Sequence, residues 1–395
     1  MEIVRFGDLY LIPASNGVSR PSEVRGQGYK MVNMGELFAN DIICDIPMER
    51  VELSDKEKTK FLLHEDDLLF ARQSLIASGA GKCSIVKELG EETTFESHLI
   101  RIRLNKKLCN PWYFFYQFQL KYNPIKTIVN QCAQAGIRGA ELKKIKIYLP
   151  PRKKQDKISS ILSSYDDLIE NNNKRIKILE QMAENLYKEW FVYEKIKDKS
   201  KEVRLNEIIN IIRGLSYTSE EIEVAEGVNL VNLKNIQAYG GFRRDGLKLY
   251  AGKYKNGQVV SYGNLIMGVT DMTQDRRTVG SVAIVPRLEG VSVISADLIK
   301  ISSKINNVFL YAMFKYGNVS KYISQFANGA NVLHLKPQAI LNVKILLPPK
   351  SLIDKYVNIT SKLFNEIEYL NQTNDNLTKQ RDMLLPRLMS GKLEV

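Results

Sequence analysis

The sequence has few of the residues from which proteins build metal sites and disulfide frameworks. Only four cysteines and three histidines occur among 395 residues, and they form neither a Cys-x-x-Cys motif nor a metal-ligand spacing. These residues are Cys44, Cys83, Cys109, Cys132, His64, His98 and His334. Because disulfides persist in oxidising compartments, we expect four free thiols in a reducing cytoplasm.

Long hydrophobic runs are missing as well. No apolar stretch approaches the roughly 20 residues that a membrane-spanning helix needs. The opening stretch, "MEIVRFGDLY", carries Glu2 and Asp8 and lacks the apolar segment and cleavage site of a signal peptide. We therefore expect a cytoplasmic protein that does not enter a membrane.

Motifs of catalytic sites are also missing. A DNA methyltransferase needs a glycine-rich cofactor loop and an Asn/Asp-Pro-Pro-aromatic stretch, but both Pro-Pro pairs follow leucine and precede Arg152 or Lys350. The stretch "GAGKC" at 79–83 lacks the first glycine and the Ser/Thr of a phosphate loop, and it predicts a hairpin turn. The carboxylates at 65–67 favour a solvated turn over a metal site. We predict that the chain is not an enzyme.

Positive charge, in contrast, is plentiful. The 57 lysines and arginines outnumber the 44 acidic residues and give a formal net charge of +13 at pH 7. This surplus favours a polyanionic partner such as nucleic acid. With 44% hydrophobic and 26% charged residues, the composition is otherwise that of an ordinary globular protein, long enough for two or more domains.

One long stretch of the chain is used twice. "LPPRKKQDKI" begins at Leu149, and "LPPKSLIDKY" begins at Leu347, which is 198 residues later (347 minus 149). Further matches keep the same order: "GYKMVNMGEL" (28–37) with "GVNLVNLKNI" (227–236), "DLLFAR" (67–72) with "NLIMGV" (264–269), and "HLIRI" (98–102) with "DLIKI" (297–301). Ordered matches at a nearly constant offset indicate a tandem duplication.

Each copy has two parts. The first part is rich in short alternating segments, of which 97–104 and 291–302 predict strands, and 111–122 predicts a helix that begins at a proline. The second part carries a heptad pattern. We therefore predict an α+β protein with mixed domains at 1–148 and 200–346 and helical regions at 149–199 and 347–395.

The helical regions carry a seam of residues spaced alternately by four and three. The first seam is Ile158, Leu162, Tyr165, Ile169, Asn172, Ile176, Leu179, Ala183, Leu186 and Trp190. The second is Tyr356, Thr360, Leu363, Ile367, Leu370, Asn374, Leu377, Arg381, Leu384 and Leu388. A helix of about 40 residues is roughly 60 Å long and cannot bury its seam alone, so we expect the two to pair as a coiled coil. The alternative is that each helix lies on its own domain.

Two similar units in one chain are expected to pack about a pseudo-two-fold axis. The helices then run antiparallel, and the C-terminus lies beside the first domain, near the N-terminus. DNA has two-fold axes of the same kind, and its successive major-groove faces lie roughly 34 Å apart. The expected architecture is a helical spacer that carries two DNA-reading domains.

The two domains differ in their loops although their strand-like frames agree. Residues 41–58 are acidic and apolar, whereas the corresponding residues 238–258 are rich in glycine, tyrosine and lysine. The two domains are therefore expected to read different sequences. The predicted target is a bipartite, asymmetric site with unread base pairs in the middle.

Two long motifs resemble those of a known family. The stretch "LPPRKKQDKISSILSSYDDLIENNNKRIKILEQMAENLYKEWF" resembles the central conserved region of the specificity (S) subunit, HsdS, of type I restriction–modification enzymes. The stretch "NDNLTKQRDMLLPRLMSGKLEV" resembles the C-terminal conserved region of that family. The resemblance covers essentially the whole chain. It implies two target recognition domains separated by an antiparallel pair of conserved helices.

The resemblance also implies partners. A specificity subunit binds double-stranded DNA and recruits two adenine-methylating M subunits and two R subunits, which are ATP-driven motor-nucleases. S-adenosylmethionine, ATP and magnesium are then expected in the partner subunits and not in this chain. The complex, rather than the chain, would methylate or cleave DNA.

For DNA contact the sequence offers basic and polar clusters in predicted loops. Arginine suits guanine edges and phosphates, and glutamine suits adenine. The candidates in the first domain are Arg20, Arg25, Lys30, Arg72, Gln73, Lys82 and Arg138. Those in the second are Arg243, Arg244, Lys253, Lys255, Gln274, Arg276 and Arg277. A solvated surface charge is the alternative for each of them.

The outer faces of the helices offer a second kind of site. Four basic and aromatic residues lie partly off the seam or at its end, namely Lys174, Arg175, Tyr187 and Phe191. We expect them to be exposed and to bind the methyltransferase subunits.

Two other functions remain open on the sequence alone. A stand-alone tandem DNA-binding regulator explains the charge and the duplication equally well. It would bind DNA selectively by itself, whereas a specificity subunit needs its methyltransferase. A catalytic methyltransferase or nuclease is the third reading, and the missing motifs argue against it.

Overall fold

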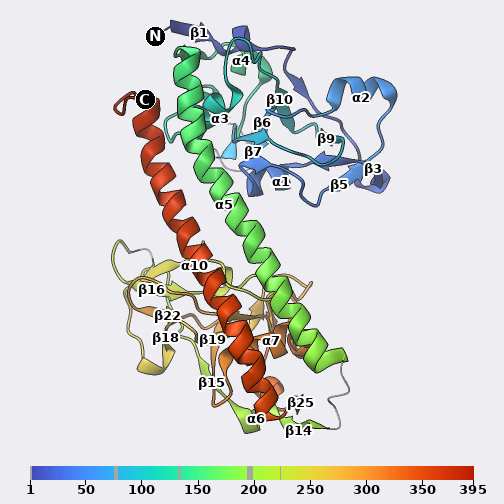
Figure 1. Ribbon diagram of the computed structural model, residues 1–395, viewed down its shortest axis with the longest axis vertical. Helices are drawn as coiled ribbons and strands as arrows, with labels where there is room; N and C mark the ends of the chain where they lie inside the picture. Colours follow the sequence, from blue (N-terminus) through green and yellow to red (C-terminus); the bar gives the residue numbers. More distant parts are fainter. Residues whose placement is uncertain (1, 75–78, 132–134, 194–198, 223) are drawn as a thin grey trace. The chain divides into compact units, whose positions relative to one another are not determined.

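The computed structural model describes residues 2–74, 79–131, 135–193, 199–222 and 224–395. The chain forms two compact units, one of residues 1–170 with 375–395 and the other of residues 171–374. Each unit contains a mixed domain of strands and short helices and one half of each of two long helices, α5 (Arg152–Tyr187) and α10 (Lys350–Met389) (Figure 1).

The mixed domain of unit 1 is built on a five-stranded sheet. Its strands, in spatial order, are β2 (Ser15–Asn16), β10 (Leu99–Ile102), β6 (Leu68–Ala71), β8 (Cys83–Val86) and β4 (Ile42–Ile43). Helix α3 (Pro111–Gln119) supplies aromatic side chains to the core beside this sheet. Asn110 caps α3 by accepting a hydrogen bond from the Trp112 amide, and proline at the first helical position needs no such partner.

Smaller sheets complete unit 1. They are β5 (Glu49–Val51) with β3 (Arg25–Val32) and β9 (Thr93–Phe95), β11 (Asn130–Gln131) with β12 (Ala135–Gly136) and β7 (Gln73–Ser74), and β1 (Glu2–Arg5) with β13 (Lys146–Leu149). The short helices are α1 (Met34–Ala39), α2 (Asp55–Phe61) and α4 (Gly139–Leu142). Because β13 runs directly into α5, the pairing of β1 with β13 ties the N-terminal strand to the start of the long helix.

Unit 2 repeats this plan. Its largest sheets are β15 (Ile209–Arg213), β23 (Leu298–Ser303), β19 (Leu265–Gly268) and β21 (Val282–Ile284), and β17 (Lys248–Tyr250), β16 (Val228–Val231), β22 (Ser292–Ile294) and β18 (Val259–Val260). Two pairs, β14 (Lys201–Arg204) with β25 (Lys344–Leu347) and β20 (Thr270–Asp271) with β24 (Leu333–His334), and helices α6 (Leu205–Ile208), α7 (Asn307–Lys315), α8 (Val319–Ser324) and α9 (Pro337–Leu341) complete it.

Equivalent strands pair in equivalent registers. Glu2 lies opposite Leu149 in unit 1, and Lys201 lies opposite Leu347 in unit 2. The strand expected at 97–104 is β10, and the helix expected at 111–122 is α3. The continuous strand expected at 291–302 is wrong, because a turn between β22 and β23, closed by the Leu298 amide on the Ser295 carbonyl, divides it in two.

In unit 1 the start of α5 lies against the end of α10. Ile158 and Leu162 share one buried cluster with Leu385 and Leu388, which also contains the aromatic residues of α3. Arg381 of α10 pairs with the buried Asp166 of α5, and Asp166 accepts a further hydrogen bond from the Tyr116 hydroxyl. A polar position in the second seam is thus used to hold a buried charge.

In unit 2 the end of α5 lies against the start of α10. The Tyr356 hydroxyl donates to the Ala183 carbonyl across the pair at 3.2 Å. The two seam asparagines meet, because Asn172 Nδ2 donates to Asn374 Oδ1 at 2.8 Å. Asn374 in turn donates to Asn173 Oδ1 at 2.9 Å. A buried asparagine pair fixes the register of a coiled coil, since any shift leaves both amides unpaired.

The predicted fold class is therefore confirmed, including the antiparallel direction of the helix pair. Both ends of the chain lie in unit 1, as expected, and Val395 and Val4 pack against the same buried cluster. Helix α10 continues through Pro386 and ends at Met389. The boundaries proposed at 148, 199 and 346 stay predictions, because the compact units divide each long helix between them.

Removal of the Arg381 guanidinium tests the buried charge pair in unit 1. Arg381→Ala leaves Asp166 buried and without its cation, so we expect a loss of about 3 kcal/mol and a fall in Tm of roughly 6–12 °C. Arg387→Ala, an exposed change on the same helix, is the control and should leave Tm nearly unchanged. Equal Tm values for the two variants, measured by circular dichroism, would contradict this role.

Candidate nucleic-acid interface

Each unit carries a small sheet built in the same way. Edge sheet 1 consists of β7, β11 and β12, and edge sheet 2 consists of β20 and β24. The Ile137 amide donates to the Arg72 carbonyl at 2.9 Å, and the Leu335 amide donates to the Val269 carbonyl at 2.8 Å. The duplication equates Arg72 with Val269, so the two edge sheets are attached to their domains by the same backbone contact.

Asp271 organises the loop that follows β20. Its carboxylate is buried and accepts hydrogen bonds from the amides of Thr273 at 2.9 Å and Thr278 at 2.7 Å. Burial alone would raise the pKa of Asp271, but the hydrogen bonds from Thr278 and Thr273 outweigh it and hold the pKa below 3.8. An ionised carboxylate therefore closes the loop at neutral pH.

The closed loop displays three of the predicted DNA-binding residues. Gln274 donates to the Ala330 carbonyl at 2.9 Å, and Arg277 pairs with Asp275 at 2.5 Å. Arg276 is exposed, with φ of 53° at the tip, and its side chain has no hydrogen-bond or ion-pair partner within the described part of the chain. Arg276 is thus the residue of this loop whose guanidinium is available to a ligand.

Edge sheet 1 brings together predicted residues that are far apart in sequence. Gln73 lies opposite Gly136 in the sheet, two residues before the exposed Arg138. The Oε1 atom of Gln73 lies 3.1 Å from Nδ1 of the exposed His98. Arg72 reaches the Ser97 carbonyl at 3.5 Å. Arg72, Gln73 and Arg138 therefore belong to one polar surface, which His98 extends.

His98 and Asp297 are the residues that the sequence reasoning missed. The matched stretches "HLIRI" and "DLIKI" equate them, and each bonds the equivalent residue of its edge sheet. Asp297 accepts from the Thr270 hydroxyl at 3.0 Å, as His98 contacts Gln73. The alignment of the two repeats contained a signal for this contact. The positions of His98 and Gln73 in the first repeat are occupied by Asp297 and Thr270 in the second, so both members of the contacting pair differ.

The remaining candidates of the first domain are held in ion pairs. Arg20 binds Glu57 at 2.6 Å, and the Ser54 amide and Arg20 lower the pKa of Glu57 to about 2. Lys30 pairs with Asp45 and Glu91 at 2.5 and 3.0 Å.

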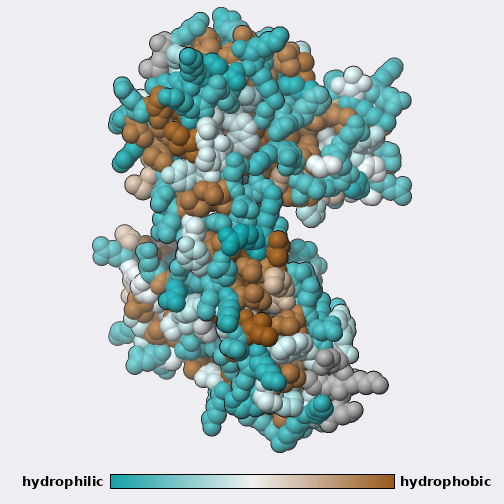
Figure 2. Space-filling model, viewed as in Figure 1, coloured by the Kyte–Doolittle hydropathy of each residue, from teal (hydrophilic) through white to brown (hydrophobic). Residues whose placement is uncertain are grey.

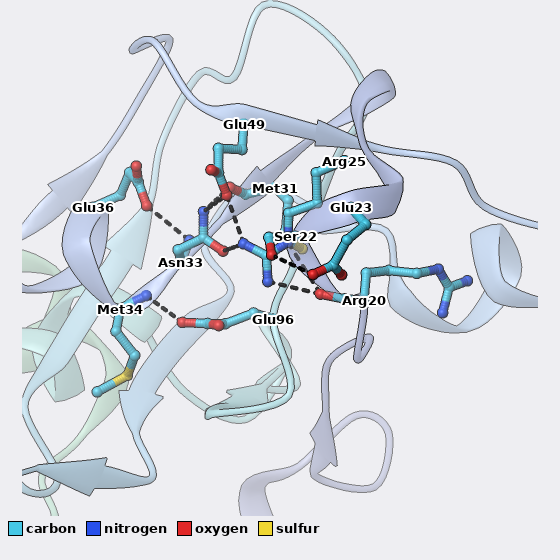
Figure 3. Close-up of polar contacts among 10 residues, drawn as sticks. All are labelled: Arg20, Ser22, Glu23, Arg25, Met31, Asn33, Met34, Glu36, Glu49 and Glu96. Carbon is cyan, nitrogen blue, oxygen red and sulfur yellow. Dashed lines mark hydrogen bonds and ion pairs between the residues drawn. The ribbon is translucent and has the colours of Figure 1, made fainter.

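Arg25 lies at the centre of a polar network (Figure 3). Its guanidinium donates to Glu49 at 2.6 Å, to the Arg20 carbonyl at 2.9 Å and to Asn33 Oδ1 at 3.3 Å. These bonds shape the β3–β5 surface. Contact of Arg25 with DNA stays a prediction.

Lys82 belongs to the turn predicted at 79–83. The Lys82 amide donates to the Gly79 carbonyl at 3.2 Å, and Gly81 has φ of 76°, which glycine adopts readily. The Lys82 ammonium group binds the Phe38 carbonyl at 2.8 Å and the Asp41 carboxylate at 3.1 Å.

In the second domain the structure separates Arg243 from Arg244. Arg243 is exposed and pairs with Asp245 at 2.5 Å, and Lys253 and Lys255 are exposed nearby in sequence. Arg244 instead binds Glu368 of α10 through two bonds, at 2.8 and 2.9 Å. Arg244 thus joins the domain to the helix, and its contact with DNA stays a prediction.

Two predictions about exposure are wrong. Tyr187 is only 6% exposed and lies in the core of unit 2 against Tyr356 and Phe309, where Phe191 also packs. Both rings fill the space between α5 and the mixed domain. Lys174 and Arg175 are exposed, as expected, and Arg175 pairs with Glu366 at 2.9 Å.

The carboxylates at 65–67 form a turn in which Glu65 is exposed, as expected, but Asp67 is not. Asp67 is fully buried and binds Arg103 through both oxygens at 2.7 Å. Within the described ranges, no cluster of His, Cys, Asp and Glu could hold a metal ion. Cys83 and Cys109 are buried free thiols, and Cys132 lies outside the described residues.

A comparison with known proteins accounts for the duplicated unit. Residues 1–181 match the family model of the type I restriction modification DNA specificity domain. The MjaVIII specificity subunit of Methanocaldococcus jannaschii is 24% identical to this chain, and the match covers all of this chain and 93% of that subunit. The chain is thus similar to type I restriction–modification specificity subunits, and its first 181 residues match their DNA specificity domain. The MjaIX specificity subunit of the same organism is 26% identical over 72% of this chain and 69% of its own length.

The fold agrees with this family. The crystal structure of the specificity subunit of a type I system from M. genitalium superposes with a TM-score of 0.58 at 15% sequence identity, covering 98% of this chain and 95% of that one. Across the described residues, no helix is both long and apolar enough to cross a membrane.

The carboxylate of Asp271 offers a pH test of loop closure. The pKa of Asp271 is lower in the folded protein than its usual value of 3.8. The stability that the ionised carboxylate contributes is therefore complete above pH 3.8 and is lost as the pH falls through the pKa of the folded protein. We expect the amides of Thr273 and Thr278 to be protected from hydrogen exchange near neutral pH. Asp271→Ala should remove this protection at all pH values. Unchanged exchange in the variant would contradict the role of Asp271.

Proposed function

We propose that this chain is the non-catalytic DNA-recognition subunit of a cytoplasmic type I restriction–modification enzyme. It binds a bipartite, asymmetric DNA sequence, and each mixed domain reads one half. The observation that carries the proposal is the pair of edge sheets, which share a backbone frame and differ in side chains. Gln73 lies in the first, His98 contacts Gln73 and Arg138 follows the strand opposite, whereas Gln274, Arg276 and Arg277 follow the first strand of the second.

The paired helices supply the spacer. At 1.5 Å per residue, the 36 residues of α5 extend about 54 Å and the 40 residues of α10 about 60 Å. The asparagine pair at 172 and 374 fixes their register, so the two half-sites are read at a set separation. A regulator that binds one contiguous operator has no need of this spacer.

The chain also acts as a scaffold for two M and two R subunits. The partners bring the chemistry, with S-adenosylmethionine for adenine methylation and ATP with magnesium for the motor-nuclease. Figure 2 shows apolar surface over the parts of α5 and α10 that belong to unit 2. Ile178 and Met182, which are one helical turn apart and half exposed or more, lie on this stretch of α5. They replace the buried Tyr187 and the partly buried Phe191 as the proposed anchors of a methyltransferase subunit, beside Lys174 and Arg175.

Dependence on the methyltransferase tests the proposed function. The chain alone and the chain with its M subunits are each titrated with a random DNA library, and the bound sequences are read. Selective binding that needs the M subunits supports the proposal. Equally selective binding by the isolated chain supports a stand-alone regulator and contradicts the proposal.

Arg276 and Arg138, whose side chains have no hydrogen-bond or ion-pair partner among the described residues, should each affect one half of the site. We expect Arg276→Ala and Arg138→Ala each to relax discrimination by about 1–3 kcal/mol at positions in one half only. The two variants should affect opposite halves, because the residues lie in different domains. Lys30→Ala serves as a control, since its ammonium group is held by Asp45 and Glu91. An effect of either arginine on both halves would refute the assignment.

Removal of apolar surface from α5 tests the scaffold. Ile178→Ser combined with Met182→Ser should weaken co-purification of the M subunit by roughly tenfold or more. Two apolar side chains that become buried when the M subunit binds contribute about 1–2 kcal/mol each to the binding free energy. Tyr122→Ser, at an 85% exposed aromatic residue, is the control. Equal recovery of the M subunit from both variants would exclude this face.

A further inference from the structure

We infer that Glu170 and Glu368 orient the two mixed domains on the long helices and thereby determine how sharply each half-site is read. The inference rests on the proposed function, because it concerns how the same domains meet DNA. Both glutamates lie outside the edge sheets. They act as positioning residues and not as DNA contacts.

In unit 2, Glu368 of α10 gathers donors from two segments of the mixed domain. Its two oxygens accept from Arg244 Nη2 at 2.9 and 2.8 Å, and Oε1 also accepts from the Arg287 amide at 2.9 Å. The Glu368 side chain is 11% exposed. Arg244 lies in the 238–258 stretch and Arg287 follows β21, so one carboxylate binds two parts of the domain to the helix.

A second contact lies one turn earlier on α10. The Tyr262 hydroxyl donates to Asn365 Oδ1 at 3.0 Å, and the Arg287 guanidinium lies over the Tyr262 ring, 4.3 Å from its centroid. The domain therefore touches α10 at Asn365 and Glu368, which are neighbours on one helical face.

In unit 1 the same place is used on α5. Lys87 Nζ binds Glu170 at 2.7 Å and Asp167 at 2.8 Å. Partial burial lowers the pKa of Lys87, but the hydrogen bonds to these two carboxylates outweigh it and raise the pKa above its usual value. Lys87 follows β8 as Arg287 follows β21, so corresponding turns make the contact.

The two contacts are related by the duplication. Glu368 and Glu170 are 198 residues apart (368 minus 170), as are Asn365 and Asp167 (365 minus 167), and 198 is the offset of the two Leu-Pro-Pro motifs. The backbone leading to each turn also matches. The Val86 amide donates to the Asp67 backbone carbonyl, and the Val285 amide donates to the Asn264 backbone carbonyl. One anchoring position has therefore been kept in both copies while its cationic partner has changed.

The geometry of these contacts restricts rotation as well as distance. Arg244 donates from Nη2 to both oxygens of Glu368 and from Nη1 to the Arg287 carbonyl at 3.2 Å, so one planar guanidinium holds two groups at once, unlike a single exposed ion pair. The exposed pair of Arg175 with Glu366, with side chains 53% and 42% exposed, joins the two helices and makes a suitable comparison. Such surface pairs contribute little to stability. Loss of Glu368 should let the mixed domain turn on α10, which moves edge sheet 2 away from its base pairs.

The test uses the full chain assembled with its M subunits and bound to a random DNA library. In Glu368→Ala we expect discrimination in one half-site to fall roughly fivefold or more. Spacers one base pair longer or shorter should also be accepted. Glu170→Ala should relax the opposite half, and less strongly, because Asp167 still holds Lys87. Glu366→Ala is the matched control and should preserve both halves and the spacer.

A conservative variant protects the test from a folding failure. Arg244→Lys keeps the positive charge but loses the second nitrogen that binds the Arg287 carbonyl, so it should relax the same half as Glu368→Ala without loss of assembly. Unaltered half-site and spacer selection in both Glu368→Ala and Arg244→Lys would overturn the inference. A wild-type complex that selects no bipartite sequence would instead overturn the proposed function.

Discussion

The pairing of α5 with α10 is the constraint on which the rest of the structure depends. Unit 1 is not made of contiguous sequence, because it needs the end of α10 from the far end of the chain, and unit 2 needs the later part of α5 and the earlier part of α10. Leu385 and Leu388 return to cover Ile158 and Leu162 in unit 1, and in unit 2 Tyr356 packs against Tyr187. The polar seam positions are placed where a wrong register would leave a buried group without a partner.

The two mixed domains share their backbone contacts and differ in the side chains of their edge sheets. Both mixed domains attach their edge sheets through the same backbone bond, and both dock a turn on the same position of a long helix. Side chains change in linked pairs, such as Gln73 with His98 and Thr270 with Asp297. If the domains read half-sites as proposed, a duplicated unit can acquire a new half-site without a change in the helix pair.

The helix pair and the duplication could be predicted because their signals are periodic and local. The seam positions follow from spacing, and the shared unit of the two chain ends follows from the symmetry of the duplication. The direct bond between Asn172 and Asn374 did not, because an exposed asparagine fits the same seam position. Whether a given arginine is exposed or held in an ion pair could not be predicted. Arg25 meets Glu49, and Arg244 meets Glu368, across 24 and 124 residues, and no local pattern distinguishes such arginines from exposed ones. Tyr187 is buried because the mixed domain covers α5 beside the seam, which a heptad pattern does not record.

The most direct test of a duplicated reader on a fixed helical spacer is the pattern of methylated adenines that the complex leaves in DNA. The chain and its M subunits are expressed in a host without other adenine methyltransferases, and every modified position is sequenced. The account predicts one asymmetric sequence with two specified segments and a constant number of unspecified base pairs between them. A single uninterrupted sequence, or two segments at variable separation, would contradict it.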